Sequence, residues 1–131
     1  MPTLRRTAAL AATGTLIATT AAAAVVTSAG PASADVERRG ACSTGTWELS
    51  ADREGRAFEV TVDLDRLPAG STWRIRLAHE GKVVTSVTRR ADREGEIELE
   101  RLRPNTAGKD TFRFSATRVG GGTCRGGLVT R

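Results

Sequence analysis

Few side chains in this sequence are suited to acid–base or nucleophilic catalysis. A Ser-His-Asp or Cys-His site needs a base beside its nucleophile, and the 131-residue chain has one histidine, His79. His79 precedes Glu80-Gly81, a turn signal, and a histidine at a turn is usually part of the polar surface. The sequence therefore predicts no nucleophilic active site, and we expect that the protein is not an enzyme.

Closely spaced carboxylates are the second set of residues that could carry chemistry. Asp63 and Asp65 stand two residues apart, as do Glu96, Glu98 and Glu100. On a β-strand this spacing puts each set on one face, where solvation makes a carboxylate a poor general acid. Asp63 and Asp65 also precede no loop with regular calcium-ligand spacing. We expect a solvated acidic surface, with no metal site and no cofactor.

Two glycine-rich segments resemble binding motifs only in part. Gly120-Gly121-Gly122 is not followed by a helical pattern, which a phosphate loop requires. Arg125-Gly126-Gly127 occurs once, in a chain that we expect to be exported. We interpret both segments as a flexible hairpin before the last strand, and we predict no nucleic-acid partner.

Residues 1–34 are typical of a secretory signal peptide. Arg5 and Arg6 give the positively charged start, residues 8–26 form a weakly apolar stretch, and Ala32-Ser33-Ala34 supplies the small residues of a cleavage site. Polar and glycine residues within the apolar stretch argue against a membrane-spanning helix. The leader therefore predicts export, by general secretion rather than by the twin-arginine route.

Cleavage before Asp35 leaves residues 35–131 as a single domain. Cys42 is preceded by Arg39-Gly40-Ala41 rather than by an aliphatic residue, so it is a poor lipidation site. We therefore expect a released extracellular protein with no membrane anchor after cleavage.

The two cysteines, Cys42 and Cys124, are predicted to form a disulfide. An exported chain meets an oxidising compartment, and two cysteines allow a single pairing. Closing so long a loop removes about 4 to 5 kcal/mol of unfolded-state freedom on the chain-entropy model. A redox or metal-binding pair is the alternative, but the chain has no C-x-x-C motif.

Apolar and polar residues alternate with a period of two from Thr46 onward, and no segment of ten residues has helical spacing. Seven strands with one apolar face each need a second sheet to cover that face. We therefore predict an all-β, immunoglobulin-like or fibronectin-like sandwich of about seven antiparallel strands. The alternating runs cover residues 47–49, 58–64, 73–77, 83–87, 97–99, 112–116 and 124–129, and the main core residues are Trp47, Phe58, Trp73, Phe112 and Phe114.

Charge separates between the two predicted sheets. A fibronectin-like order puts the first, second and fifth runs in one sheet, whose outward residues are Glu48, Glu59, Asp63, Asp65, Glu96, Glu98 and Glu100. The other sheet presents Arg74, Arg76 and Arg113, with Arg118 and Arg125 near its ends. We expect an electrostatically two-faced particle, for which simple solvation of charged strands is the alternative interpretation.

A series of short motifs runs along nearly all of residues 35–131. They are Asp35-Val36-Glu37, Gly40-x-Cys42, Trp47-x-Leu49, Gly55-Arg56, Glu59-Val60-x-Val62-Asp63, Trp73-x-Ile75-x-Leu77-x-His79-x-Gly81, Gly95-x-Ile97-Glu98-Leu99, Asn105-x-Ala107-Gly108-x-Asp110-x-Phe112 and Cys124-x-Gly126. In these motifs the sequence resembles a family of small secreted actinomycete proteins of unknown function. This resemblance implies an exported β-sandwich with one disulfide and no known activity.

Two functions remain after these exclusions. The first is an extracellular interaction module whose face, formed by Arg74, Arg76 and Arg113, binds an anionic wall polymer or an acidic protein surface. The second is a secreted inhibitor or small-ligand carrier that acts through loops, such as 102–109 or 120–123.

Overall fold

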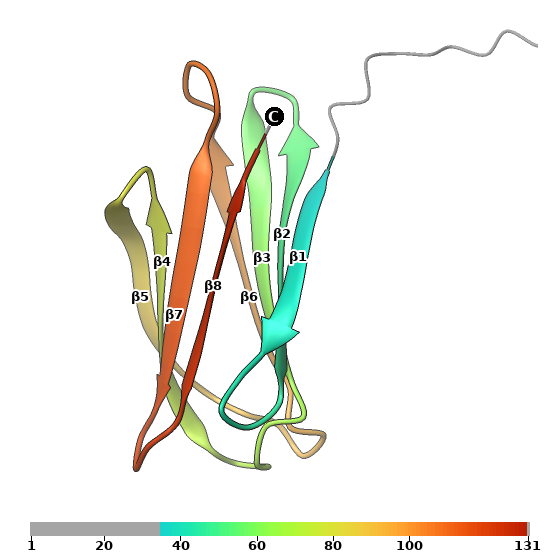
Figure 1. Ribbon diagram of the computed structural model, residues 1–131, viewed down its shortest axis with the longest axis vertical. Helices are drawn as coiled ribbons and strands as arrows, with labels where there is room; N and C mark the ends of the chain where they lie inside the picture. The colour runs from blue at the N-terminus through green and yellow to red at the C-terminus, as the bar shows by residue number, and fades with distance from the viewer. Residues whose placement is uncertain (1–34, 131) are drawn as a thin grey trace, which may run out of the picture. The chain divides into compact units, whose positions relative to one another are not determined.

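A computed structural model describes residues 35–130, which form a two-sheet β-sandwich (Figure 1). One sheet has the strand order β1-β2-β3-β6 and the other β5-β4-β7-β8, with every neighbouring pair antiparallel. This confirms the predicted all-β sandwich. The predicted signal peptide, residues 1–34, lies outside the described residues. The strands are β1 (Val36–Ala41), β2 (Thr46–Glu54), β3 (Ala57–Asp65), β4 (Thr72–His79), β5 (Lys82–Arg90), β6 (Ile97–Pro104), β7 (Thr111–Arg118) and β8 (Thr123–Val129).

All seven predicted runs are strands, and β1 is an eighth that the alternation did not predict. β1 pairs along its whole length with β2, yet of its inward-facing positions only Val36 is a sizeable apolar residue. Backbone pairing rather than side-chain burial therefore holds this strand in place. The predicted runs begin at residue 47 and so imply that Cys42 precedes the first strand; this is wrong, because Cys42 follows β1.

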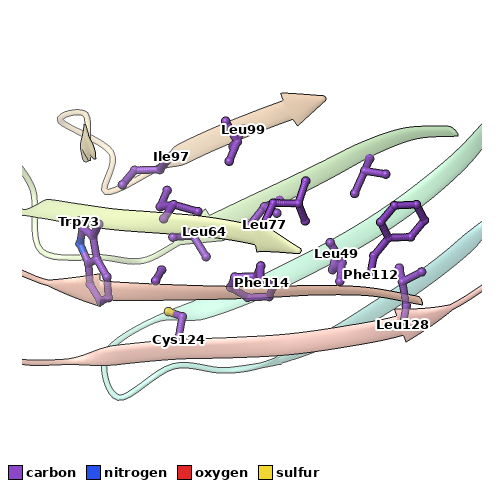
Figure 2. Close-up of a cluster of buried hydrophobic side chains, with 14 of the residues drawn as sticks. Leu49, Leu64, Trp73, Leu77, Ile97, Leu99, Phe112, Phe114, Cys124 and Leu128 are labelled. Carbon is purple, nitrogen blue, oxygen red and sulfur yellow. The ribbon is translucent and has the colours of Figure 1, made fainter. Parts of the chain in front are cut away.

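The core consists of the inward side chains of both sheets (Figure 2). Leu49, Val62 and Leu99 occupy one row across β2, β3 and β6 and are buried. Trp73, Ile75 and Leu77 face them from β4. Burying one such side chain contributes about 1.5 to 3 kcal/mol, so the period-two pattern decides which side of each strand faces inward. Of the five predicted core aromatics, Phe58, Trp73, Phe112 and Phe114 are buried and Trp47 is half-buried.

The chain crosses between the sheets after β3, β5 and β6, whereas β4 and β5 form a tight hairpin. The two residues of that hairpin, Glu80 and Gly81, have φ angles of 51° and 78°. Positive φ at both positions is the feature of the primed turns whose twist suits a two-residue hairpin. The turn fixes where β4 ends and how it pairs with β5. It therefore helps to determine which β4 residues point outward and which point into the core.

Trp47 fills the opening between the sheets at the edge where β1 approaches β8. A Cβ added to Gly40 of β1 would lie 2.6 Å from the indole, and one added to Gly126 of β8 would lie 2.5 Å from it. The ring of Phe114 meets the indole edge-on, with centroids 5.3 Å apart. Two glycines on different sheets therefore create the space that this side chain occupies.

The predicted disulfide is present at the same edge. Cys42 and Cys124 are bonded, with Cα atoms 4.4 Å apart and a sequence separation of 82. The Ser43 amide donates to the Thr123 carbonyl at 2.9 Å, and the Thr123 amide donates to Ser43 Oγ at 2.8 Å. The bridge and this pair of hydrogen bonds join the β1–β2 loop to the start of β8.

We predict that Gly126→Ala lowers the free energy of unfolding by about 1 to 3 kcal/mol, because the new methyl overlaps Trp47 and Phe114. Gly127→Ala is the matched control, since its Cβ would come no closer than 3.2 Å to Arg113 Cγ and to the Phe112 carbonyl oxygen, so it should cost less than Gly126→Ala. Urea unfolding followed by tryptophan fluorescence measures both. Equal losses in the two variants would contradict the proposed packing of Trp47.

Candidate binding face

The three predicted binding arginines all lie on the outward side of the sheet β5-β4-β7-β8. Arg74 and Arg76 are exposed on β4, and Arg113 is exposed on β7. The backbone register pairs Arg76 with Ser115, two residues from Arg113. Arg76 and Arg113 are therefore diagonal neighbours, about 7 to 8 Å apart at their Cα atoms. We call this outward surface, with Arg125 of β8, the arginine face.

A hollow of about 390 Å³ lies on the arginine face. Three arginines and three hydroxyl side chains line it, an arrangement that suits carboxylate, sulfate or phosphate oxygens. Its volume is at the lower end of the range for small-ligand sites. We call it the arginine hollow, and its lining residues are Arg74, Arg76, Thr88, Ser115, Thr117, Arg118 and Val119.

Arg113 does not line the arginine hollow but a second groove, of about 600 Å³, along β8. Arg125 of β8 and Arg38 of β1 line the same groove. The three predicted arginines therefore line two different hollows. Arg74 and Arg76 share one with a further arginine, and Arg113 shares the other with two further arginines. Arg38 could not be found from the sequence, because β1 carries no alternating apolar pattern.

The arginine face carries little negative charge of its own. Arg74, Arg76 and Arg113 form no ion pair within residues 35–130. Glu80, in the turn that follows β4, is an acidic residue close in sequence to Arg76. Its carboxylate accepts a hydrogen bond from the Thr111 amide at 2.5 Å. The guanidinium groups are therefore available to an external anion.

The opposite sheet presents the predicted acidic residues on its outward side. The register puts Glu48, Asp63 and Glu98 directly opposite one another on β2, β3 and β6. All three point outward, because their neighbours in the strands, Leu49, Val62 and Leu99, point into the core. We call this outward surface the acidic face. Its predicted members are Glu48, Glu59, Asp63, Asp65, Glu96, Glu98 and Glu100, to which the register adds Glu37, Asp52 and Glu54.

Crowding of carboxylates on the acidic face shifts their protonation. Burial, followed by the charges of Glu98 and Glu48, raises the pKa of Asp63 from 3.8 to about 6. The charge of Glu100 is the main cause that raises the pKa of Glu59. At the edge of this face Arg39 binds Glu37 at 2.7 Å and Glu48 at 2.8 Å. The acids farther from β1 are left with like-charged neighbours.

His79 is buried, so its interpretation as polar turn surface is wrong. It is the last residue of β4 and continues the inward series of Trp73, Ile75 and Leu77. Its ring stacks on Phe112 with centroids 4.4 Å apart. The same period-two rule that located the strand places this side chain inside, and that signal was present in the sequence.

The partner of His79 is Asp110, for which no pattern in the sequence predicts such a role. The atoms His79 Nε2 and Asp110 Oδ1 are 2.6 Å apart, and Thr106 donates its hydroxyl to the same oxygen at 2.7 Å. Burial alone raises the pKa of Asp110, but the hydrogen bonds from Thr106 and His79 outweigh it, and the pKa lies below its usual 3.8. Arg103 Nε donates to His79 Nδ1 at 3.4 Å, so Nε2 carries the proton shared with Asp110.

One ligand atom from each of His79, Glu80 and Asp110 lies within 4.8 Å of the others. Each group already has a hydrogen-bond partner, and the Arg103 guanidinium adds a positive charge beside His79. A cation there would displace these bonds and meet that charge. We interpret the group as a structural link between the ends of β4, β6 and β7.

The chain matches no protein-family model, no curated protein and no solved structure. The resemblance to small secreted actinomycete proteins therefore stays a prediction. Within residues 35–130 no helix is long and apolar enough to cross a membrane.

We predict that Asp63→Asn raises the free energy of unfolding by about 1 kcal/mol at pH 7.5, allowing for partial solvent screening. Because the folded-state pKa is about 6 and the unfolded value is 3.8, ionisation of Asp63 destabilises the fold. That cost is absent below pH 3.8 and complete once the pH exceeds 6. The difference in the free energy of unfolding between Asp63→Asn and the parent protein should therefore become smaller as urea titrations are moved from pH 7.5 toward pH 4. An equal difference at both pH values would contradict this account.

Proposed function

We propose that the protein is a secreted, non-catalytic binding module that recognises an anionic partner through the arginine face. The observation that carries the proposal is the arginine hollow, where Arg74 and Arg76 stand beside hydroxyl groups and form no ion pair within residues 35–130. Arginines in a concave site bind carboxylate or phosphate oxygens in pairs of hydrogen bonds, whereas scattered surface arginines do not converge on one ligand.

The lack of a built-in counter-charge supports the same proposal. Acidic side chains would be expected to intersperse with arginines on a surface selected for solubility alone. Here the outward positions that neighbour Arg74 and Arg76 are Thr88, Thr117, Ser86 and Ser115. Hydroxyl neighbours leave the positive charge unneutralised and offer further donors to an anion.

The fold and its bridge support the proposals of secretion and of an immunoglobulin/fibronectin-like domain. A disulfide that links the β1–β2 loop to β8 suits an oxidising compartment. Three strands of one sheet, β2-β3-β6, and four of the other, β5-β4-β7-β8, follow the order expected for a fibronectin-like sandwich, with β1 added at the edge. Membership of the small secreted actinomycete family is part of this proposal.

We predict that reversing the arginine face weakens anion binding. The probes are immobilised inorganic polyphosphate, for phosphate polymers, and poly-glutamate, for acidic protein surfaces. The variant Arg74→Glu/Arg76→Glu/Arg113→Glu should bind at least about tenfold more weakly than the parent protein at low salt, because several screened charge pairs are lost. Elution salt and titration of the soluble polymer give the measurement.

The matched control is Arg56→Glu/Arg93→Glu/Lys109→Glu, which changes net charge equally at exposed turn and loop positions. It should bind both probes nearly as the parent does. Loss of binding in the control alone would move the site to the turns and loops that carry its three substitutions, as an inhibitor or carrier acting through loops requires. Equal loss in both variants would reduce the interaction to net charge and overturn the proposal.

Secretion has its own test. When the full gene is expressed in a secreting bacterial host, the product in the medium should begin at Asp35 and have a mass two hydrogens below that of the reduced chain. Ala34→Phe should leave the leader attached, because the cleavage site needs a small residue there. Intact-mass spectrometry reads both results, and a secreted product that keeps its leader would contradict the predicted cleavage.

A further inference from the structure

The acidic face has a large exposed apolar side chain, on its edge strand β6. Leu102 of β6 is 65% exposed. The register pairs it with Glu59 of β3, which points outward, so Leu102 lies on the acidic face. Glu100 precedes it by two residues on the same side of β6. An apolar side chain is thus bordered by one carboxylate across the strands, about 5 Å away, and one along the strand, about 7 Å away.

The arginine hollow has the complementary composition. Val119 lines it and is 70% exposed. Arg74, Arg76 and Arg118 line the same hollow. An apolar side chain at the end of β7 therefore shares a hollow with arginines of one sheet, and an apolar side chain bordered by carboxylates lies on the outward side of the other sheet. Exposed apolar groups rimmed by charge are typical of interaction sites.

The charges of the two faces are complementary: carboxylates crowd together on the acidic face, and the arginines of the arginine face lack ion-pair partners among the described residues. The carboxylates of Glu59 and Glu100 repel each other, which raises the pKa of Glu59. Within residues 35–130 the one cation that forms ion pairs on this face is Arg39, and it binds Glu37 and Glu48 instead. Guanidinium groups placed over Glu59 and Glu100 would relieve this repulsion, and the arginine face presents such groups without partners of its own.

We propose that the anionic partner of the arginine face is the acidic face of a second copy of this chain, with Leu102 seated in the arginine hollow. Glu59 and Glu100 then meet Arg74 and Arg76, and the leucine packs against Val119. This inference rests on the proposed function, because it names the partner of the same site.

The arrangement is heterologous, because each copy contributes two different surfaces. The two surfaces lie on the outward sides of different sheets, so a copy that has used its acidic face still presents its arginine face. Such contacts build open chains, or rings where the rotation between copies closes, rather than two-fold symmetric dimers. Assembly should therefore grow with protein concentration and be lost at high salt, since exposed charges are screened over about 8 to 10 Å at 0.10 to 0.15 M salt.

Two variants of the secreted protein test this arrangement by sedimentation velocity. Arg74→Gln/Arg76→Gln removes the two arginines of the hollow that would meet Glu59 and Glu100, and Glu59→Gln/Glu100→Gln/Leu102→Ser removes the surface that enters the hollow. Neutral replacements are used so that the altered surfaces gain no attraction for each other. Each variant alone should be monomeric, whereas an equimolar mixture should form a 1:1 dimer and nothing larger, because each variant keeps one working surface. The dimer also shows that both variants are folded.

A single substitution tests whether Leu102 of one copy packs in the arginine hollow of another. Leu102→Ser should weaken the self-association of the parent protein about tenfold, as expected for an apolar side chain removed from a buried contact. Val83→Ser is the control, since Val83 is 59% exposed on β5 and does not line the arginine hollow. Equal weakening by both substitutions would overturn the assignment of Leu102.

The remaining outcomes separate this inference from the proposed function. A parent protein that stays monomeric at low salt and high concentration overturns the inference, as does a mixture of the two variants that fails to form the dimer. If such a protein still binds polyphosphate or poly-glutamate through Arg74 and Arg76, the proposed function stands. If it binds neither probe, both are overturned.

Discussion

The packing of two sheets through their inward side chains is the interaction on which the other features of this protein depend. Leu49, Val62 and Leu99 cannot enter the core without turning Glu48, Asp63 and Glu98 to the solvent, because successive side chains of a strand point to opposite sides. The same constraint on β4 buries Ile75 and exposes Arg74 and Arg76. The charged surfaces are therefore consequences of core formation, and moving a charge to the other side would require a register shift that exposes the core.

The separation of charge has an energetic cost that the sandwich tolerates. Like charges opposite one another across strands are mildly destabilising. Burial of Asp63, together with the neighbouring charges of Glu98 and Glu48, raises the pKa of Asp63 to about 6. The disulfide between Cys42 and Cys124 and the fit of Trp47 between Gly40 and Gly126 strengthen the edge where β1 meets β8. The arginines on the other sheet are too far away, across a layer of side chains about 10 Å thick, to neutralise the acids directly. A charge supplied from outside the chain can do so.

The sequence predicted those parts of the fold that hydrophobic alternation controls. It located seven strands, the disulfide, and the outward positions of Arg74, Arg76 and Arg113 on one sheet. It missed β1, whose position depends on backbone pairing, and therefore Arg38 beside the second groove. The turn after His79 predicts an exposed side chain, but the inward series of β4 continues to this last residue of the strand and buries it. Asp110 stands in a loop, where no alternation predicts that it is buried. The arginine hollow could not be predicted, since its shape depends on how β4, β5 and β7 twist together with Val119.

The edges of the two sheets are poor sites for association, which directs contact to the faces. An exposed strand edge can pair with another chain unless charge, proline or irregularity prevents it. β1 has three charged residues among six, and β6 ends at Pro104 after alternating glutamates. β5 carries Arg89 and Arg90, and its pairing with β4 shifts between Leu77 and Ala78. The loop after β1 occupies the start of the β8 edge through Ser43 and Thr123. With its edges protected in this way, the sandwich offers a partner mainly its two outward faces, and their opposite charges allow one to bind the other.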